Sequence, residues 1–203
     1  DPETYKMLGQ GDTEGVFQLE SSGMKQVLVG LQPQNLEDVI ALISLYRPGP
    51  MDSIPTYLRN RHEPDKISYK TPQLAHILDV TNGCIVYQEQ VMQIFRELAG
   101  FSFGQADNVR RAMSKKKHAV MEAEREHFVH GCTEPGHECP GCVANGISEK
   151  VANEIYDEMS SFASYAFNKS HAACYAYVAF QTAYLKCHYP SEFMAALLTS
   201  VLD

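Results

Sequence analysis

The sequence predicts a mainly α-helical fold, an irregular multi-helix domain with at most one or two short strands. Two observations support this prediction. Apolar residues recur at the three- and four-residue spacing of amphipathic helices, and several of these segments follow a capping Ser or Asn or stop at Gly or Pro. The composition is that of a globular chain, because 44% of the 203 residues are hydrophobic and 21% are charged.

The first half of the chain contains two well-marked helices. Either serine at 21–22 can cap a short helix that closes near Gly30. Asn35 can cap the next helix, and Pro48-Gly49-Pro50 stops it, because two prolines cannot continue a helix. Shorter helices are expected at 51–61 and 72–78.

The second half contains the best strand candidate, Cys84 to Tyr87, a short apolar stretch after the turn signal Asn82-Gly83. A Gly-, Pro- and Cys-rich irregular loop is expected at about 131–146. The helices expected here span residues 88–100, 104–113, 117–130, 148–159, 170–188 and 191–202. All of these elements are expected to belong to one domain, residues 1–203.

The overall charge misleads about possible partners. Seventeen Lys and Arg against 25 Asp and Glu give a net charge of −8, which argues against nucleic acid. However, five of the basic residues fall within 110–117, whereas acidic residues gather on the helices at 122–126 and 149–158. The acidic total therefore describes outer faces, and the functional surface is predicted to be locally basic.

The ends and the apolar runs bear on location. The longest apolar run, Ala172 to Phe180, is less than half a membrane span, so no membrane partner is expected. The opening Asp1-Pro2-Glu3 does not read as a signal peptide, which favours reduced thiols in a cytoplasm. Since no initiator Met is present, we expect a piece of a longer protein.

A dense basic run is the first candidate site. Its five cations are Arg110, Arg111, Lys115, Lys116 and Lys117. No acidic residue lies between Asp107 and Glu122, and such density is typical of a site that binds an anion, usually phosphate. On a helix Arg110 and Arg111 point about 100° apart while Met113 returns to the core. The alternative is a solvated helix end whose lysines interact with the helix dipole.

Two further segments could hold phosphate. Asn168 or Ser170 can cap the helix that follows, which would put Lys169 and His171 beside free backbone N–H groups at its N-terminus. Arg47 precedes a rigid Pro-Gly-Pro corner, and a fixed Arg suits bidentate phosphate contact. The alternatives are an ordinary capped helix and a plain helix stop with a solvent-facing Arg.

The cysteine-rich loop suggests a metal. Three thiols and one imidazole within eleven residues match a tetrahedral structural zinc site. Its candidate ligands are Cys132, His137, Cys139 and Cys142. The alternative is an unliganded surface loop. No catalytic set stands out, because the sequence has no Asp-x-Asp pair, Gly-rich phosphate loop, nucleophile elbow or His-Glu-x-x-His motif.

Six segments together resemble the catalytic alpha subunits of bacterial DNA polymerase III, the C-family replicative polymerases. They are Gly15–Ser21, Tyr46–Pro50, Tyr87–Met92, Arg110–Lys117, Phe167–His171 and Tyr189–Met194. They occur in the order that the family shows and cover nearly the whole chain. The resemblance implies the fingers domain of a DNA-directed DNA polymerase, with the cysteine-rich loop as a departure from the many relatives that have only a short turn there.

The resemblance implies roles for named residues. The candidates for contact with the triphosphate of the incoming dNTP are Arg47, Arg110, Arg111, Lys115, Lys169 and His171. The candidates for the pocket around the nascent base pair are Tyr87, Gln88, Gln90, Asn168 and Ser170. Lys169 or His171 could also act as a general acid toward the leaving pyrophosphate.

The resemblance also implies what the segment lacks and what it contacts. The acidic ligands of two Mg²⁺ ions belong to the palm domain, so this segment alone should be inactive. Primer-template DNA, the other polymerase domains and other replicase subunits would be its partners. Two readings compete with this one: a stand-alone helical module that binds nucleic-acid backbones, and an interaction module stabilised by Zn²⁺.

Overall fold

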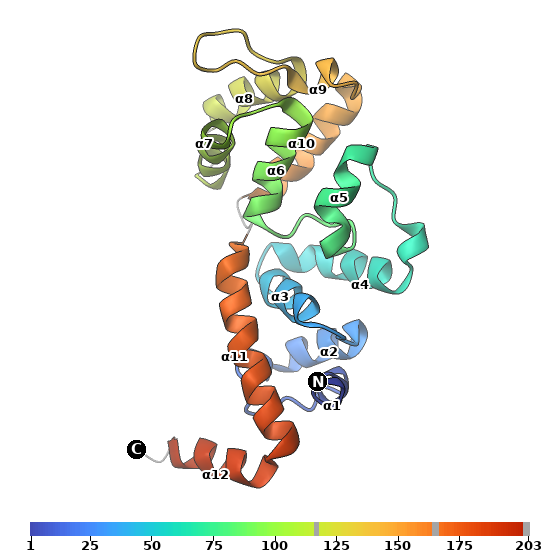
Figure 1. Cartoon of the computed structure of the whole chain (residues 1–203), viewed down its shortest axis with the longest axis vertical. Helices are drawn as coiled ribbons and strands as arrows, with labels where there is room; N and C mark the ends of the chain where they lie inside the picture. The colour runs from blue at the N-terminus through green and yellow to red at the C-terminus, as the bar shows by residue number, and fades with distance from the viewer. Residues whose placement is uncertain (116–117, 164–166, 201–203) are drawn as a thin grey trace. The chain divides into compact units, whose positions relative to one another are not determined.

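The computed structural model describes residues 1–115, 118–163 and 167–200 (Figure 1). Over these residues the chain forms twelve α-helices and four short 3-10 helices. Strand pairing in the described residues is limited to two isolated bridges, Tyr87 with Phe167 and Cys132 with Cys139. The predicted mainly α-helical fold is therefore confirmed. No helix in the described part of the chain has the length and apolar character needed to cross a membrane.

The chain folds into two compact units. Unit 1 combines the two ends of the chain, Asp1–Arg47 and Lys169–Asp203, and unit 2 is the segment Pro48–Asn168 between them. The expected domain of residues 1–203 thus consists of a discontinuous unit and a continuous one.

Unit 1 is organised around a long helix, α11. Its helices are α1 (Pro2–Gly9), α2 (Ser22–Leu31), α3 (Leu36–Leu45), α11 (Lys169–His188) and α12 (Pro190–Ser200). α11 packs along α3 and α1, as the orange and blue ribbons of Figure 1 show. The buried residues of α11 are all alanines: Ala172, Ala176, Ala179 and Ala183. Small side chains at this spacing form one smooth face, which lets the neighbouring helix approach closely.

Unit 2 surrounds an apolar core. Its α-helices are α4 (Ile54–His62), α5 (Ala75–Leu78), α6 (Gln88–Ala99), α7 (Phe103–Ser114), α8 (His118–His130), α9 (Gly141–Ala144) and α10 (Glu149–Ala163). Its 3-10 helices are η1 (Pro50–Ser53), η2 (Pro64–Lys66), η3 (Pro72–Leu74) and η4 (Asp79–Thr81). α6 packs on α7, α8, α9 and α10, and its apolar face supplies the centre of the core.

The expected helix boundaries are largely confirmed by the caps. The Ser21 hydroxyl accepts a hydrogen bond from Met24 N, and the Asn35 side chain accepts one from Asp38 N. α1 was not expected, although Asp1 caps it and Pro2 stands at its first position, which is a typical helix start. The irregular loop also contains one unexpected helical turn, α9.

The strand expected from Cys84 to Tyr87 is wrong. Only Tyr87 pairs, in a single parallel bridge with Phe167, and the preceding residues are extended without a partner strand. Their backbone groups bond to side chains instead: Val86 N and Tyr87 N both donate to Gln90 Oε1 at 2.9 Å. A glutamine in the first turn of α6 thus takes the place of a neighbouring strand.

Candidate functional site

A pocket in unit 2 brings together three of the residues singled out in the sequence. Gln88, Arg110 and Asn168 line a cavity of about 470 Å³ between α6 and α7. The other lining residues are Glu89, Met92, Gln93, Arg96, Glu97, Phe103 and Asp107. We refer to this cavity as the arginine pocket.

A backbone contact brings Asn168 to the arginine pocket. Gln88 N, in the first turn of α6, donates a hydrogen bond to Phe167 O at 3.0 Å. The same two segments form the parallel bridge between Tyr87 and Phe167. Residues 80 positions apart in the sequence are therefore joined at the start of α6.

Helical spacing places Arg110 and Arg111 on one carboxylate. Arg110 Nε and Nη2 donate to Asp107 Oδ1 at 2.9 and 2.7 Å, and Arg110 Nη1 donates to Gln88 Oε1 at 2.9 Å. Arg111 Nε lies 2.7 Å from Asp107 Oδ2. Asp107 stands three and four residues before the two arginines, the spacing at which helical side chains meet. Both guanidinium groups are thus held on the two oxygens of one carboxylate.

The contacts of this cluster affect the pKa of Asp107, and its two arginines differ in exposure. The hydrogen bond from Arg110 lowers the pKa of Asp107 and outweighs the opposing effect of partial burial, and Arg111 lowers it further. The Arg110 side chain is 19% exposed, whereas that of Arg111 is 64% exposed. Arg110 is therefore fixed within the pocket wall, and Arg111 is exposed to solvent and able to turn toward an incoming anion.

The arginine pocket also has a cation beside an exposed ring in its wall. Arg96 Cζ lies 5.9 Å from the centre of the Phe103 ring, and Phe103 is 64% exposed. Sequence reasoning missed Arg96, Phe103 and the role of Asp107. The spacing of Asp107 before the two arginines is a signal that could have found it, whereas Arg96 and Phe103 carry no such local signal.

Tyr87 and Gln90 lie beneath the surface. Tyr87 is 1% exposed and Gln90 is 4% exposed. Gln90 Nε2 donates to Ile77 O at 3.1 Å and to Thr81 Oγ1 at 2.7 Å, while its Oε1 accepts from two backbone N–H groups. Gln90 therefore ties three segments together and is not among the residues that line the arginine pocket.

The rest of the basic run extends beyond α7. Met113 is fully buried, as the helical spacing predicts, and Lys115 is an exposed residue that ends the helix. Lys116 and Lys117 lie outside the described residues.

The remaining candidates belong to unit 1. α11 begins at Lys169, so Asn168 stands at the position before the helix, and Ser170, one of the two expected caps, lies with His171 in its first turn. Lys169 Nζ is 2.9 Å from Glu37 Oε2, and the His171 ring lies 4.3 Å from that of Tyr175. Arg47 follows the end of α3, where partial burial lowers its pKa.

The comparisons with known proteins agree with the resemblance. The family model of the bacterial DNA polymerase III alpha subunit finger domain matches residues 1–136. This chain belongs to that family. It is 51% identical over 204 residues to the DNA polymerase III subunit alpha of Thermus aquaticus, covering 98% of this chain and 16% of that protein. It is 46% identical over 202 residues to that of Staphylococcus aureus strain Mu50, covering 100% of this chain and 18% of that protein.

The finger-domain match has limits along the chain. It includes Arg47, Gln88, Arg110 and Arg111, whereas residues 137–203 lie outside it and align with the relatives only. The chain spans less than a fifth of the length of the curated relatives it matches.

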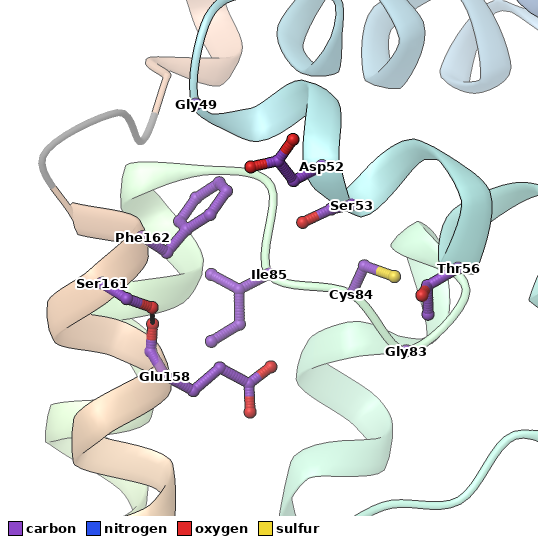
Figure 2. Close-up of a pocket in the computed structure, with 10 residues that line it drawn as sticks. All are labelled: Gly49, Asp52, Ser53, Thr56, Gly83, Cys84, Ile85, Glu158, Ser161 and Phe162. Carbon is purple, nitrogen blue, oxygen red and sulfur yellow. Dashed lines mark hydrogen bonds between the residues drawn. The ribbon is translucent and has the colours of Figure 1, made fainter.

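A second pocket of the finger domain has the opposite character (Figure 2). This cavity of about 500 Å³ carries Asp52 from η1 and Glu158 from α10 on different walls, with hydroxyl groups from Ser53, Thr56 and Ser161. No Lys or Arg is among its lining residues. Of these two pockets, only the arginine pocket has cations in its wall, Arg96 and Arg110, although Glu89, Glu97 and Asp107 line it as well. A polyphosphate requires such cations, so the arginine pocket is the better candidate.

The cysteine-rich loop of the finger domain closes by backbone pairing. Cys132 and Cys139 exchange backbone hydrogen bonds of 2.9 Å, and Cys139 Sγ donates to His127 O. Burial raises the pKa of Cys139, and that of Cys142 to about 12. The ligand atoms of Cys132, His137, Cys139 and Cys142 are not grouped within 4.8 Å, so the zinc site stays a prediction.

The described residues also offer no fit for Mg²⁺. The one group of three potential ligands found among them is Glu3, Cys187 and His188 in unit 1. A thiol and an imidazole are poor ligands for Mg²⁺, which prefers oxygen. No Mg²⁺ site is therefore assigned to the described part of this chain.

Proposed function

We propose that this finger domain binds the triphosphate of the incoming dNTP and shapes the pocket around the nascent base pair during DNA replication. The protein that carries it would be a DNA-directed DNA polymerase, a nucleotidyltransferase, as the names of the relatives suggest. Because its metal-binding acidic residues would lie outside this segment, the segment alone should not extend a primer.

The observation that carries the proposal is the shared carboxylate of Arg110 and Arg111. Asp107 holds the two guanidinium groups at the spacing of neighbouring oxygen atoms, which is the arrangement that a polyphosphate needs. A triphosphate offers more charge than one carboxylate, so it can displace Asp107 from Arg111. Arg110 keeps its contact to Gln88 and fixes the position of the bound phosphate.

The residues around Arg110 would shape the base-pair pocket. Gln88 and Asn168 offer amide groups at the wall of the arginine pocket, and Phe103 offers an exposed ring. Tyr87 and Gln90 would act from below by fixing the start of α6. Ser170, in the first turn of α11 in unit 1, is the remaining candidate for contact with the base pair.

The further candidates for phosphate contact lie outside the arginine pocket. Lys169 and His171 stand in the first turn of α11 in unit 1, where backbone N–H groups attract anions. Arg47 also belongs to unit 1, whereas Lys115 ends α7 in unit 2. Lys169 or His171 would donate a proton to the leaving pyrophosphate as general acid. If so, substituting the correct donor changes the pH dependence of single-turnover incorporation, whereas a mere binding contact changes only the dNTP affinity.

The partners and location follow from the same proposal. Primer-template DNA, the other domains of the alpha subunit and other replicase subunits would contact the domain in the cytoplasm. Mg²⁺ would be held by residues outside this segment. A structural Zn²⁺ on the cysteine-rich loop stays a separate prediction.

The decisive experiment uses the full-length alpha subunit that carries this segment. Arg110→Ala and Arg111→Ala should each lower kcat/KM for dNTP by roughly 10- to 100-fold, because each removes charged hydrogen bonds to phosphate. Arg59→Ala is the matched control, since Arg59 is an exposed arginine on α4 in the same unit and does not line the arginine pocket. The proposal is wrong if Arg110→Ala and Arg111→Ala both keep kcat/KM within about twofold of wild type, as the control Arg59→Ala should.

A further inference from the structure

A group of potential metal ligands lies in unit 1, where the start of α1 meets the last turn of α11. The carboxylate of Glu3, the thiol of Cys187 and the imidazole of His188 place one ligand atom each within 4.8 Å of one another. None of these residues belongs to the arginine pocket or to the cysteine-rich loop. The packing of α1 on α11 brings them together from opposite ends of the chain.

The imidazole of His188 has a carboxylate near each of its two nitrogens. Its Nε2 lies 3.0 Å from Asp1 Oδ2, and its Nδ1 lies 3.9 Å from Glu3 Oε2. The same Asp1 oxygen accepts a hydrogen bond from Thr4 N at 2.9 Å, so the cap of α1 fixes this carboxylate. With the ring proton on Nε2 and shared with Asp1, the lone pair of Nδ1 is directed toward Glu3.

This arrangement is the one found around metal-binding histidines in proteins. A carboxylate that accepts the second N–H of the ring fixes the tautomer and raises the basicity of the ligand nitrogen. The ring of Tyr184, one turn earlier on α11, lies 4.4 Å from that of His188 and limits its rotation further. Asp1 and Tyr184 therefore position His188 without being ligands.

The three donor types select the metal. Thiolate, imidazole and carboxylate together suit Zn²⁺ and not Ca²⁺ or Mg²⁺. Zinc bonds of about 2.0 to 2.3 Å at tetrahedral angles place ligand atoms about 3.3 to 3.6 Å apart. Glu3 Oε2 and His188 Nδ1 lie 3.9 Å apart, so they reach this separation through a small movement of Glu3, whose side chain is 77% exposed and therefore free to move. The nearby cation Lys186 is paired with Asp12 at 2.6 Å and with Glu14 at 3.5 Å.

We propose that Glu3, Cys187 and His188 bind one Zn²⁺ ion, with Asp1 as the positioning residue of His188. The Cys187 thiol releases its proton to solvent as the zinc–sulfur bond forms. Three protein ligands leave a fourth position for water or for a ligand from another molecule. The ion joins the first helix of the chain to the end of α11, so its binding stabilises unit 1.

The test is a metal titration of the 203-residue chain, kept reduced with a phosphine, with Co²⁺ as the spectroscopic probe and Zn²⁺ as the competitor. A thiolate bound to Co²⁺ gives a charge-transfer band that Zn²⁺ abolishes. The wild-type chain should show this band, and Cys187→Ser should lose one equivalent of bound metal. Cys174→Ser is the matched control, because Cys174 is an exposed thiol on the same helix. Cys139→Ser separates any metal held by the cysteine-rich loop.

A second variant covers the case in which Cys187→Ser fails to fold. Glu3→Gln changes an exposed side chain, and it should weaken Zn²⁺ binding at least tenfold while the circular dichroism spectrum stays unchanged. Zn²⁺ should raise the melting temperature of wild type and not of Glu3→Gln. Equal metal stoichiometry in wild type and Cys187→Ser, or equal Zn²⁺ affinity in wild type and Glu3→Gln, would overturn the proposal.

Discussion

The two units of the chain are held together in different ways. The core of unit 2 is built from large interlocking side chains, with the Phe95 ring 5.0 Å from that of Phe128 and 5.3 Å from that of Phe101. The contact of α11 in unit 1 is built from alanines, with Ala176 and Ala179 at its middle. The complementary shapes of large side chains determine the packing of unit 2. In unit 1 the close approach of two helix backbones determines the packing.

The difference teaches where each unit tolerates change. An aromatic cluster loses stability when a ring is removed, because a cavity remains. An alanine face loses little stability when a side chain is shortened, because its side chains are already small. Replacing an alanine by a larger residue destabilises it. Each of the following predictions changes one side chain in one unit, and hydrogen exchange measured by mass spectrometry can assign the loss of stability to α6 or to α11.

The largest expected effect is from Phe95→Ala in unit 2. Phe95 is fully buried and contacts three other rings, so its removal should cost about 3 to 5 kcal/mol in the free energy of unfolding. Urea denaturation followed by circular dichroism measures this loss. Phe103→Ala is the control, because that ring is 64% exposed and should cost less than about 1 kcal/mol. A similar loss in the free energy of unfolding for both variants would contradict the stabilising role of the aromatic cluster in unit 2.

The second-largest effect is expected from Gln90→Leu, which tests whether buried hydrogen bonds stabilise unit 2 in addition to its aromatic core. The change keeps the volume but leaves Val86 N and Tyr87 N, both buried, without an acceptor. We expect a loss of about 2 to 3 kcal/mol in the same denaturation experiment. Gln93→Leu serves as the reference variant, since the Gln93 amide donates to the Glu97 carboxylate at the exposed surface of the same helix. Equal stability of both variants contradicts the structural role of Gln90.

Ala179→Leu applies the opposite change to unit 1. The added side chain has no space on the face that α11 presents to its neighbours, so we expect a loss of about 1 to 3 kcal/mol through overpacking. Faster hydrogen exchange should appear in α3 and α11. Val178→Leu, at an exposed position next to it, should have little effect. If Ala179→Leu is neutral, the alanine face is not closely packed and the contrast between the units fails.

The smallest effect concerns pH and the surface of unit 2. Because Arg110 and Arg111 lower the pKa of Asp107 below its usual value of 3.8, the stability from this contact is fully present above about pH 4 and is lost as the pH falls through the lowered value. Asp107→Asn should therefore lose less stability than wild type between pH 5 and pH 3, by under about 1 kcal/mol. Urea titrations at several pH values measure the difference, and high salt should reduce it. Parallel pH curves for the two proteins would contradict the assignment.

The sequence predicts most of the fold because its helices are marked by local signals. The caps Ser21 and Asn35, and the proline stop after α3, are written in neighbouring residues. The failures arise where distant contacts decide. Cys84–Tyr87 has the apolar composition of a strand, but side chains of Gln90 and Thr81 satisfy part of its backbone. Its pairing with the distant Phe167 is limited to one bridge at Tyr87.

The candidate site follows the same rule. The helical spacing predicts that Met113 turns to the core, and Met113 is fully buried. Arg111 is 64% exposed, whereas Arg110 is only 19% exposed because Asp107 and Gln88 hold it. The burial of Gln90 was not predictable, because a polar side chain in a first turn is equally suited to solvent. The meeting of Gln88 with Asn168 depends on a backbone bond between distant segments, which no local pattern contains.

The discontinuity of unit 1 has a consequence for biosynthesis. α3 is completed at Leu45, whereas its partner α11 begins at Lys169, so the ribosome must make all of unit 2 before the two can pack. At about 5 to 20 residues per second, the apolar face of α3 waits roughly 6 to 25 s for its cover. During that interval the nascent chain keeps exposed a face of α3 that α11 covers in the finished protein, so slower synthesis lengthens its exposure to aggregation.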